Sequence, residues 1–342
     1  MQAENLDLNP VYNKLVPASN LTGHIRAVDP AHDLEKIADL IELCFAQQMD
    51  DDGRDYLRHI RRAARDANFQ RWARGSNEQV PVPLFGYVWE ENGAIVGNLT
   101  LIPFQRGGVW RYLAANIATH PDYRGKGIAY QLTQTAIEHV RYHKASAIWL
   151  QVRDDNPIAH HLYLTLGFIE RARRTTWEVS EPPPPLLSLD DHQITARRKI
   201  EWPLEEKWLQ NIYPPEVSWN LNFRIERCAP GLFRNLTRLF YSDHIEQWAV
   251  HRENVLLGVS IWDAGVYNAE TVWVAPNPTC EDESLCALLT LLRREVLAPR
   301  PMMINYPAGR GSKAFLEAGF SIHNTLIWME INFDQEAQLK AT

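Results

Sequence analysis

The chain has 342 residues, which is long for one hydrophobic core and suits two domains, and its 45% apolar content is ordinary for globular proteins. It carries 35 basic and 42 acidic residues, and the formal net charge of −7 argues against a nucleic-acid binder and against an anionic membrane surface as partner. The sequence has no apolar stretch near the roughly 20 residues that span a bilayer, and its N-terminal MQAENLDLNP lacks the blocks of a secretion signal. We therefore expect a cytoplasmic protein whose partners are small molecules.

The segment MDDDGRDYLRHIRRAARDANFQRWARG, which starts at Met49, is unusually rich in charge. Its acidic cluster Asp50–Asp52 either caps the start of a helix or receives a cationic amine. Arginines dominate from Arg54 to Arg74, and they indicate either a solvated helix face or a site for a substrate with a carboxylate or phosphate group.

A glycine-rich turn lies between the strand-like run Trp110–Thr119 and a helix-like run that begins at Ile128. Its residues Arg124–Ala129 read RGKGIA. Glycines let backbone N–H groups point inward together, and the first helical turn adds unpaired donors and a partial positive charge, so the turn suits a diphosphate. A Walker loop is excluded because no Ser or Thr follows the lysine. A dinucleotide fingerprint is excluded because Tyr130 stands where a small residue is needed.

A second motif, NPIAHHLYLTLGF, follows the apolar run Ile148–Val152, which we interpret as a buried strand. Asn156 suits a helix cap, Pro157 suits the first turn, and Gly167 suits the stop. Positions 156, 159, 163 and 167 then share one helical face. In isolation such a helix would simply pack on a sheet, but its place after the glycine turn favours a role in binding.

The two motifs together resemble the coenzyme A loop and the following Asn/Tyr helix of the GNAT acyltransferase superfamily, and the resemblance covers residues 24–180. It implies an α/β (α+β) fold with a mixed, largely antiparallel twisted sheet flanked by helices, and it implies acetyl-CoA as the acyl donor. The resemblance assigns the diphosphate to Arg124, Gly125, Lys126, Gly127, Ile128 and Ala129. It assigns the pantetheine and thioester to Ile117, Ala118, Thr119, Asn156, Ala159 and Tyr163.

The resemblance also implies the chemistry of transfer. Tyr163 would protonate the departing thiolate, and Asn156 would orient the pantetheine or a water molecule. A backbone amide near Asn116 or Ile117 would polarise the thioester carbonyl, and a bulge there would splay this strand from the next to form the acyl slot. The strand Trp110–Thr119 contains no acid, so the general base stays open among three side chains and a water chain: Asp154, Asp155 and His120.

The proline run EPPPPLLSLD, residues 181–190, marks the end of the first domain. Beyond it the sequence resembles a degenerate second copy, because four features recur: Ile25 and Pro30 match Ile225 and Pro230, Gly97 matches Gly258, Pro121 matches Pro276, and Gly167-Phe168 matches Gly319-Phe320. This alignment predicts that a segment around residues 46–84 is missing from the second copy. The expected parts are an N-terminal arm (1–22), a catalytic domain (23–180), a linker (181–222), a degenerate GNAT-like domain (223–334) and a tail (335–342).

The second copy is expected to have lost the cofactor. The same alignment replaces Arg124, Gly127 and Ala129 by residues of the acidic stretch TCEDES, namely Thr279, Asp282 and Ser284. It also replaces Tyr163 by Phe315 and Asn156 by Ala308. We expect this domain to support the structure or to shape the acceptor pocket, as in tandem members of the superfamily with one silent domain.

The sequence therefore predicts an N-acetyltransferase that moves an acetyl group directly from acetyl-CoA to a primary amine of a small molecule. Two alternatives stay open, a peptide or protein N-terminal acetyltransferase and a non-catalytic acyl-CoA-binding scaffold. No metal is expected, because the adjacent His160 and His161 have no Cys or acid at ligand spacing, and the four cysteines are expected to be free thiols.

Overall fold

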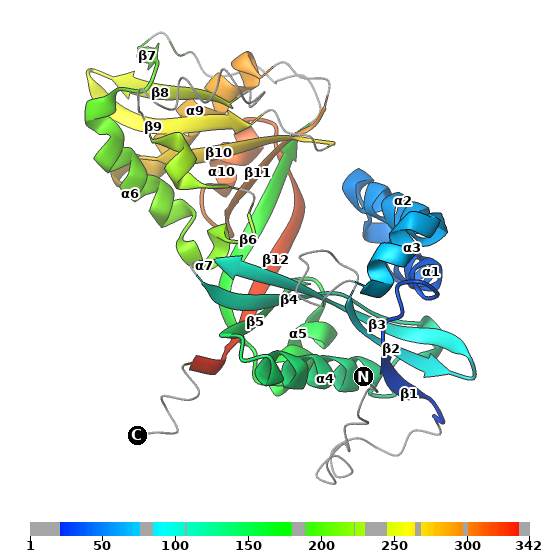
Figure 1. Cartoon of the computed structure of the whole chain (residues 1–342). Helices are drawn as coiled ribbons and strands as arrows, with labels where there is room; N and C mark the ends of the chain where they lie inside the picture. The colour runs from blue at the N-terminus through cyan, green and yellow to red at the C-terminus, as the bar shows by residue number, and fades with distance from the viewer. Residues whose placement is uncertain are drawn as a thin grey trace. The chain divides into compact units, whose positions relative to one another are not determined.

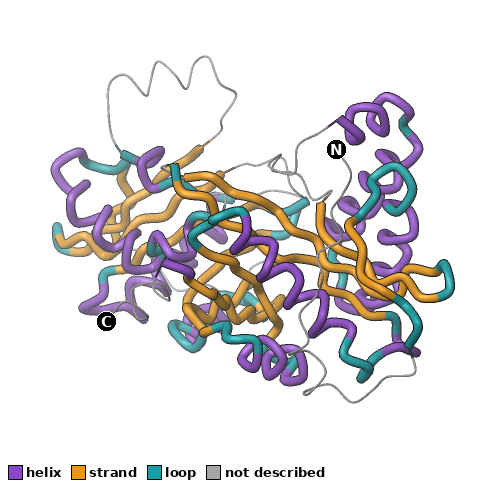
Figure 2. The backbone as a smooth tube through the Cα atoms, turned by 60° about the horizontal axis from the view of Figure 1, so that its bottom comes forward, coloured by secondary structure: helices purple, strands orange, loops and turns teal. Residues whose placement is uncertain are grey.

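The computed structural model describes residues 21–75, 85–106, 108–179, 189, 191–221, 223–229, 245–263, 268–296 and 300–334. The chain divides into two compact units, one made of residues 1–151, 158–169 and 329–342, and the other of residues 152–157 and 170–328 (Figure 1). In each unit helices lie along the faces of a sheet, as the purple and orange segments of Figure 2 show.

In the first unit the strands β1 to β5 follow one another in the order β1-β2-β3-β4-β5. The pairs from β1 to β4 are antiparallel, and β4 and β5 are parallel. Its elements are β1 (His24–Ala27), α1 (Leu34–Phe45), η2 (Ala46–Gln48), α2 (Asp51–Arg65), α3 (Ala67–Gly75), β2 (Phe85–Glu91), β3 (Ala94–Arg106), β4 (Val109–Thr119), η3 (Pro121–Tyr123), α4 (Ile128–Tyr142), β5 (Ala147–Arg153) and α5 (Pro157–Thr165).

Helix α4 packs on this sheet through one apolar face, whose buried members include Ile128, Leu132 and Ala136. A β-carbon at Gly97 of β3 would lie 2.6 Å from Cγ2 of Ile128, so the close approach of α4 requires glycine there. Helices α1–α3 lie on the other face of the sheet (Figure 1). The expected mixed, largely antiparallel sheet between helices is therefore confirmed.

The second unit has the strand order β12-β6-β11-β10-β9-β8-β7. Strand β6 pairs antiparallel with β11, although it follows α5 in the chain. Its elements are β6 (Ile169–Val179), β7 (His192–Thr195), η4 (Lys199–Glu201), α6 (Trp202–Ile212), α7 (Pro215–Ser218), η5 (Ile225–Cys228), β8 (Ile245–Arg252), β9 (Val255–Asp263), β10 (Glu270–Pro276), η6 (Pro278–Cys280), α9 (Glu281–Glu295), β11 (Met302–Pro307), α10 (Ser312–Glu317) and β12 (Ser321–Asn332).

The second unit repeats the plan of the first. Gly97 pairs with Thr119 across β3 and β4, and Gly258 pairs with Pro276 across β9 and β10. The hairpin β2–β3 has a register shift directly after Trp89, the partner of Gly97, and the hairpin β8–β9 has one directly after Val250, the partner of Gly258. The predicted tandem repeat is thus confirmed at the Gly97/Gly258 match.

The first strand of the second copy was wrongly placed by the alignment. Ile225 lies in the 3₁₀ helix η5, whereas β7 pairs antiparallel with β8 as β1 pairs with β2. The chain between β7 and β8 carries α6 and α7, so the second copy does not simply lack the segment around residues 46–84. Strand β7 reads HQIT, which is too short and polar to stand out in the sequence, and pairing with β8 makes it a strand.

The match of Pro121 with Pro276 is also wrong, because the strand registers align Pro276 with Thr119 and hence Pro278 with Pro121. Pro121 and Pro278 each begin a 3₁₀ helix, and each follows a residue whose side chain accepts a hydrogen bond from the backbone two residues on. Helix α9 begins at Glu281, directly after η6, whereas Arg124–Gly127 separate η3 from α4. The second unit therefore has no glycine turn between η6 and α9, and Thr279, Asp282 and Ser284 do not replace the residues of that turn one for one.

Candidate functional site

The turn Arg124–Ala129 has the backbone that its glycines predicted. Gly125 and Gly127 have φ angles of 74° and 81°, in the left-handed region, and Gly127 is the N-cap of α4. A β-carbon at Gly125 would meet no atom within 4 Å, so the surface beside it is open. The first turn of α4 contains no acidic residue, so its partial positive charge is not neutralised locally.

Two cations flank this turn. Arg124 is exposed, and its Nε lies 3.3 Å from the carbonyl oxygen of Thr119 at the end of β4. Lys126 is exposed, and its Nζ lies 4.7 Å from the centre of the Tyr123 ring. The guanidinium and ammonium groups therefore flank the start of α4, where the first N–H groups of a helix have no partner within the helix, and this combination suits a diphosphate.

Strand β4 contains the expected bulge. Asn98 of β3 pairs with Ala118, and Thr100 pairs with Ala115, so the two residues Asn116–Ile117 of β4 oppose a single residue of β3. Asn116 adopts a φ angle of 52°, a left-handed conformation that asparagine tolerates better than most residues. The prediction of an irregular strand at this point is confirmed.

The pairing of β4 with β5 extends from Arg111 and Ala147 to Ala114 and Leu150. In the described part of the chain it ends there, just before the bulge at Asn116–Ile117. The backbone of Ile117, Ala118 and Thr119 is thus left without a registered β5 neighbour, as the expected slot between the two strands requires. The side chain of Ala118 is buried against α1, and the carbonyl of Thr119 accepts from Arg124 and from Sγ of Cys44 at 3.3 Å.

Tyr163 occupies the last turn of α5, and a Schellman cap ends that helix after it. The N–H of Gly167 donates to the carbonyl of Leu164, and the N–H of Phe168 donates to the carbonyl of Tyr163. Gly167 has a φ angle of 91°, so the predicted glycine stop is confirmed. Tyr163 is only 6% exposed, and burial raises the pKa of its phenol above the ordinary value.

The same cap recurs in the second unit without the hydroxyl. Gly319 and Phe320 donate to the carbonyls of Leu316 and Phe315, and the Phe315–Phe320 rings meet edge to face as the Tyr163–Phe168 rings do. Phe315 is fully buried and stacks on Trp177. The predicted match of Tyr163 with Phe315 is therefore confirmed.

Asn156 is exposed and directly precedes α5, and its N–H donates to the carbonyl of Arg153 at 3.1 Å. Ala159 is half-buried in the first turns of the same helix. Among the candidate bases, Asp155 is held by two hydrogen bonds from Arg153, which lower the pKa of its carboxyl group. Asp155 is therefore a poor base, and Asp154 and His120 stay open as candidates.

The sequence analysis did not identify Asn98 and Tyr56, the two residues whose side chains hydrogen-bond to Asn116 at the bulge. Nδ2 of Asn98 donates to the carbonyl of Asn116 at 2.9 Å, and Nδ2 of Asn116 donates to the hydroxyl of Tyr56 at 2.8 Å. Burial raises the pKa of Tyr56 to about 12. The only signal available was an asparagine within each of two apolar strands, which is unusual for β structure.

In the second unit, helix α9 matches α4, and a carboxylate of the protein itself lies at its start. Helix α9 has three acids in its first turn, and the first of them, Glu281, accepts hydrogen bonds from Tyr306 at 2.8 Å and from Arg310 at 2.7 Å. Burial favours the neutral carboxyl, but these hydrogen bonds outweigh it and lower the pKa of Glu281. This helix start is therefore occupied by the protein's own charge.

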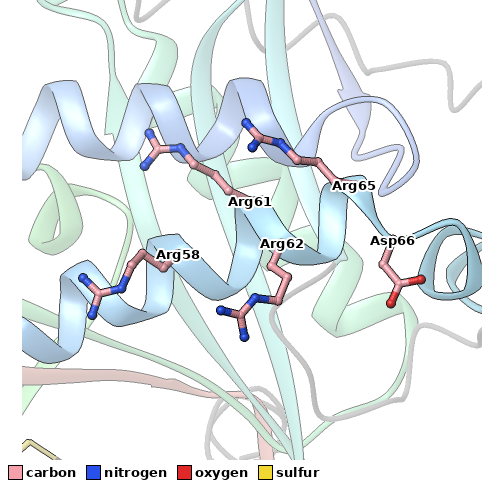
Figure 3. A pocket seen from close by; sticks show the side chains of 5 residues that line it. All are labelled: Arg58, Arg61, Arg62, Arg65 and Asp66. Carbon is pink, nitrogen blue, oxygen red and sulfur yellow. The ribbon is translucent and has the colours of Figure 1, made fainter.

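The arginines of α2 line an open hollow of about 570 Å³, which Figure 3 shows with its five lining residues: Arg58, Arg61, Arg62, Arg65 and Asp66. Arg61 and Arg65 extend toward α1, where Arg61 pairs with Asp39 at 2.8 Å and Arg65 pairs with Glu35 at 2.6 Å. Arg58 pairs with an acid of its own helix. These contacts support a solvated, charge-balanced helix face, and a role in substrate binding stays a prediction.

The acidic cluster that precedes these arginines has a structural role. The side chain of Asp50 caps α2 by accepting from the N–H of Gly53 at 2.8 Å, and Asp51 and Asp52 lie in the first turn. Within the described ranges, no group of three or more His, Cys, Asp or Glu side chains could hold a metal ion. No described helix is both long and apolar enough to cross a membrane. The four cysteines, all within the described residues, form no disulfide.

Comparisons with known proteins agree with this geometry. Residues 45–168 match the family model described as "Acetyltransferase (GNAT) family". N-alpha-acetyltransferase 30 of Schizosaccharomyces pombe is 33% identical over 92 residues, which are 27% of this chain and 61% of that protein. The [Ribosomal protein bS18]-alanine N-acetyltransferase of Escherichia coli K12 is 36% identical over 62 residues, which are 18% of this chain and 42% of that protein. The chain thus spans less than two thirds of the length of both relatives.

Among solved structures, a GCN5-related N-acetyltransferase from Sphaerobacter thermophilus aligns with a TM-score of 0.54 at 16% identity, over 91% of this chain and 95% of that one. A GCN5-related glucosamine N-acetyltransferase region of a fungal multi-domain β-N-acetylglucosaminidase aligns with a TM-score of 0.55 at 13% identity, over 92% of this chain and 38% of that one. At these identities the likeness concerns the fold alone. Residues 45–168 are therefore a segment that matches the acetyltransferase (GNAT) family, and the chain has the fold of the GCN5-related N-acetyltransferase from Sphaerobacter thermophilus.

Proposed function

We propose that the protein is an acetyl-CoA-dependent N-acetyltransferase whose cofactor site lies in the first unit. The observation that carries the proposal is the sequence of features along β4 and α4, where a bulged strand leads directly into a cationic glycine turn at a helix start. The diphosphate of coenzyme A would bind the N–H groups of Gly125–Ala129 and the side chains of Arg124 and Lys126. The N–H of Arg124 itself donates to the carbonyl of Pro121. The pantetheine arm would follow the edge of Ile117–Thr119 that has no registered partner on β5.

Transfer would proceed directly from the thioester to the amine. The amine nitrogen attacks the carbonyl carbon, the carbonyl oxygen becomes an oxyanion at a β4 amide, and the carbon–sulfur bond breaks. Tyr163 would give its proton to the departing thiolate, and Asn156 would orient the pantetheine or a water molecule. The described site offers no cysteine on β4 or α5 that would form an acyl-enzyme, and holding both reactants together lowers the barrier without one.

The acceptor we favour is a primary amine of a small molecule. The second candidate is the N-terminal amine of a peptide or protein, and the names of the two relatives favour it, since one is an N-alpha-acetyltransferase and the other acetylates an alanine of ribosomal protein bS18. Their matched segments cover 27% and 18% of this chain, so they bear on the catalytic core more than on the acceptor.

The test incubates the full chain with acetyl-CoA and two panels of acceptors, small primary amines and short peptides with free N-termini. Release of free thiol gives the rate, and mass spectrometry identifies the acetylated product. We expect thiol release that depends on one acceptor class and a product acetylated on nitrogen. Tight acetyl-CoA binding with no transfer to either panel would instead favour the acyl-CoA-binding scaffold.

A further inference from the structure

Asn98 lies on β3 beside the bulge of β4, and its side chain is completely buried. Its Nδ2 donates to the carbonyl of Asn116 at 2.9 Å, while its Oδ1 has no hydrogen-bond partner in the described structure. A buried amide with one unsatisfied end is costly for folding. Stability alone therefore does not account for an asparagine at this position.

This hydrogen bond fixes the direction of the next amide. A trans peptide is planar, so the carbonyl of Asn116 and the N–H of Ile117 point in opposite directions. Gly97 faces α4, and successive residues of a strand face opposite sides, so Asn98 faces away from α4. The N–H of Ile117 is consequently turned to the α4 side of the sheet, where Arg124–Ala129 also lie.

Ile117 also has no registered partner on either neighbouring strand. The register of β3 and β4 gives Ile117 no partner on β3, and the pairing with β5 ends at Ala114 in the described chain. The bulge is braced from a second direction, because Nδ2 of Asn116 donates to the hydroxyl of Tyr56 on α2. Both hydrogen bonds to Asn116 come from the side opposite α4.

The second unit supplies an internal comparison. There Gly258 pairs with Pro276 and Val259 pairs with Ala275, and the pairing of β9 with β10 continues without a register shift as far as Asp263 and Thr271. Val259, which follows Gly258 as Asn98 follows Gly97, is fully buried. The asparagine and the bulge thus occur together in the unit whose helix α4 follows a glycine turn, and neither occurs in the described pairing of β9 with β10, which leads into helix α9 without such a turn.

We propose that Asn98 is a positioning residue that holds the Asn116–Ile117 peptide so that the N–H of Ile117 donates to the thioester carbonyl of acetyl-CoA. This inference rests on the proposed function. In the transfer, the new carbon–nitrogen bond forms as electrons move onto the carbonyl oxygen, and that oxyanion then collapses with cleavage of the carbon–sulfur bond. The amine loses its proton to solvent, and the thiolate gains one from Tyr163. Asn98 touches none of these atoms and acts through the peptide alone.

The test replaces Asn98 by the residue of the second unit, in the variant Asn98→Val, within the full chain. Its matched control is Thr100→Val, which also removes a buried polar group from β3, but one whose contacts to Asn98 and Asn116 are long, at 3.4 and 3.5 Å. If Asn98→Val does not fold, Asn98→Ser serves instead, since its hydroxyl is too short to reach Asn116.

The first readout is isotope-edited infrared spectroscopy of acetyl-CoA labelled with ¹³C at the thioester carbonyl, which needs no acceptor amine. In the natural protein the bound carbonyl should absorb at a lower frequency than in free acetyl-CoA, because a donated hydrogen bond weakens the C=O bond. Asn98→Val should bring the frequency back toward the free value, and Thr100→Val should not. An unchanged frequency in Asn98→Val would overturn the proposal.

The second readout is turnover with an acceptor from the panels. Loss of one oxyanion donor typically lowers kcat by about 10² to 10³, so Asn98→Val should lose roughly 10²-fold in kcat with little change in KM for acetyl-CoA or in Tm. Equal losses in Asn98→Val and Thr100→Val would also overturn it. If the natural protein bound acetyl-CoA and shifted its carbonyl without transferring the acetyl group, the proposed function would fail while the role of Asn98 stood. If it did not bind acetyl-CoA, both would fail.

Discussion

Tyr163 combines deep burial with a position that its counterpart in the second unit fills with phenylalanine. Burial raises the pKa of its phenol, so the hydroxyl stays protonated at neutral pH and keeps its proton until the pH rises past that raised value. A proton donor with this property loses its contribution only on the alkaline side. Phe315 and Phe320 form the same cap with the same edge-to-face contact, so phenylalanine fits this place in the fold.

Tyr163→Phe should therefore lower kcat by roughly 10² to 10⁴, the usual contribution of a general acid, while acetyl-CoA affinity and Tm stay close to those of the natural protein. Steady-state kinetics and a thermal melt check this together. An unchanged kcat would restrict Tyr163 to packing.

His139 on α4 provides a pH-dependent term in stability. It hydrogen-bonds the hydroxyl of Tyr87 at 2.9 Å, and burial together with the nearby charge of His143 lowers the pKa of His139 to about 4. An unfolded chain takes up this proton near pH 6.5, so the unfolded state binds more protons between pH 6.5 and 4. Stability contributed by the neutral ring is therefore complete above pH 6.5 and is lost as the pH falls toward 4.

The variant His139→Phe should reduce the fall in Tm between pH 6.5 and 4, even if it lowers Tm at pH 7 by removing the contact with Tyr87. Melting curves of both proteins across this range give the comparison. Parallel curves for the two proteins would show that His139 does not set the acid dependence.

The conformations and roles of some site residues can be predicted from the sequence, and those of others cannot. Gly127, Tyr163 and Gly167 belong to local patterns, since a turn and a helix stop are decided by neighbours in the chain, and their conformations were predictable. Asn98 and Tyr56 act through contacts with Asn116, which lies 18 and 60 residues away in sequence. No spacing rule relates such residues, so their place at the bulge required the folded structure.

The glycine turn is the element that distinguishes the two units. In the first unit Arg124–Gly127 separate η3 from α4, and in the second α9 follows η6 directly. The alignment of the two copies treated this missing turn as a set of substitutions, because it matched Pro121 with Pro276 instead of Pro278. The register of β9 with β10 shows that Pro276 ends a strand, and that Pro278 begins the 3₁₀ helix.

Gly127→Glu tests this element. A side chain at φ 81° is strained by about 1 to 2 kcal/mol, and a carboxylate would stand where the diphosphate binds, so acetyl-CoA binding should be lost while the fold persists. The matched control is Gly93→Glu in the β2–β3 turn, where φ is 78° and a β-carbon meets nothing within 4 Å. It should have similar strain and unchanged binding. Equal losses in both variants would contradict a specific role for the turn.

Some strands can be predicted from the sequence pattern and others cannot. The apolar strands β4 and β5 were predictable from composition, whereas β7 was assigned to a connecting segment. Its residues His192 and Gln193 are polar, and only the β8 edge makes them a strand. The match of Ile225 with Ile25 likewise did not identify a strand, because Ile225 begins the 3₁₀ helix η5.

The two units are not independent pieces of chain. Strand β6, which follows α5 and was expected to complete the first domain, pairs with β11 of the second unit from Arg174 and Pro307 to Val179 and Met302. A chain cut near residue 181 would leave β6 with an unpaired edge. The proposed domain boundaries therefore cannot be tested by simple truncation, and experiments on the cofactor should use the full chain.

The central claim is that only the first unit binds acetyl-CoA, because a cationic glycine turn precedes its helix α4, while Glu281 occupies the matching start of helix α9 in the second unit and pairs with Arg310. Isothermal titration calorimetry of the full chain with acetyl-CoA tests this claim most directly. The account predicts one binding site per chain, lost in Gly127→Glu and kept in Glu281→Gln. A stoichiometry of two, or binding that survives Gly127→Glu and disappears in Glu281→Gln, would contradict it.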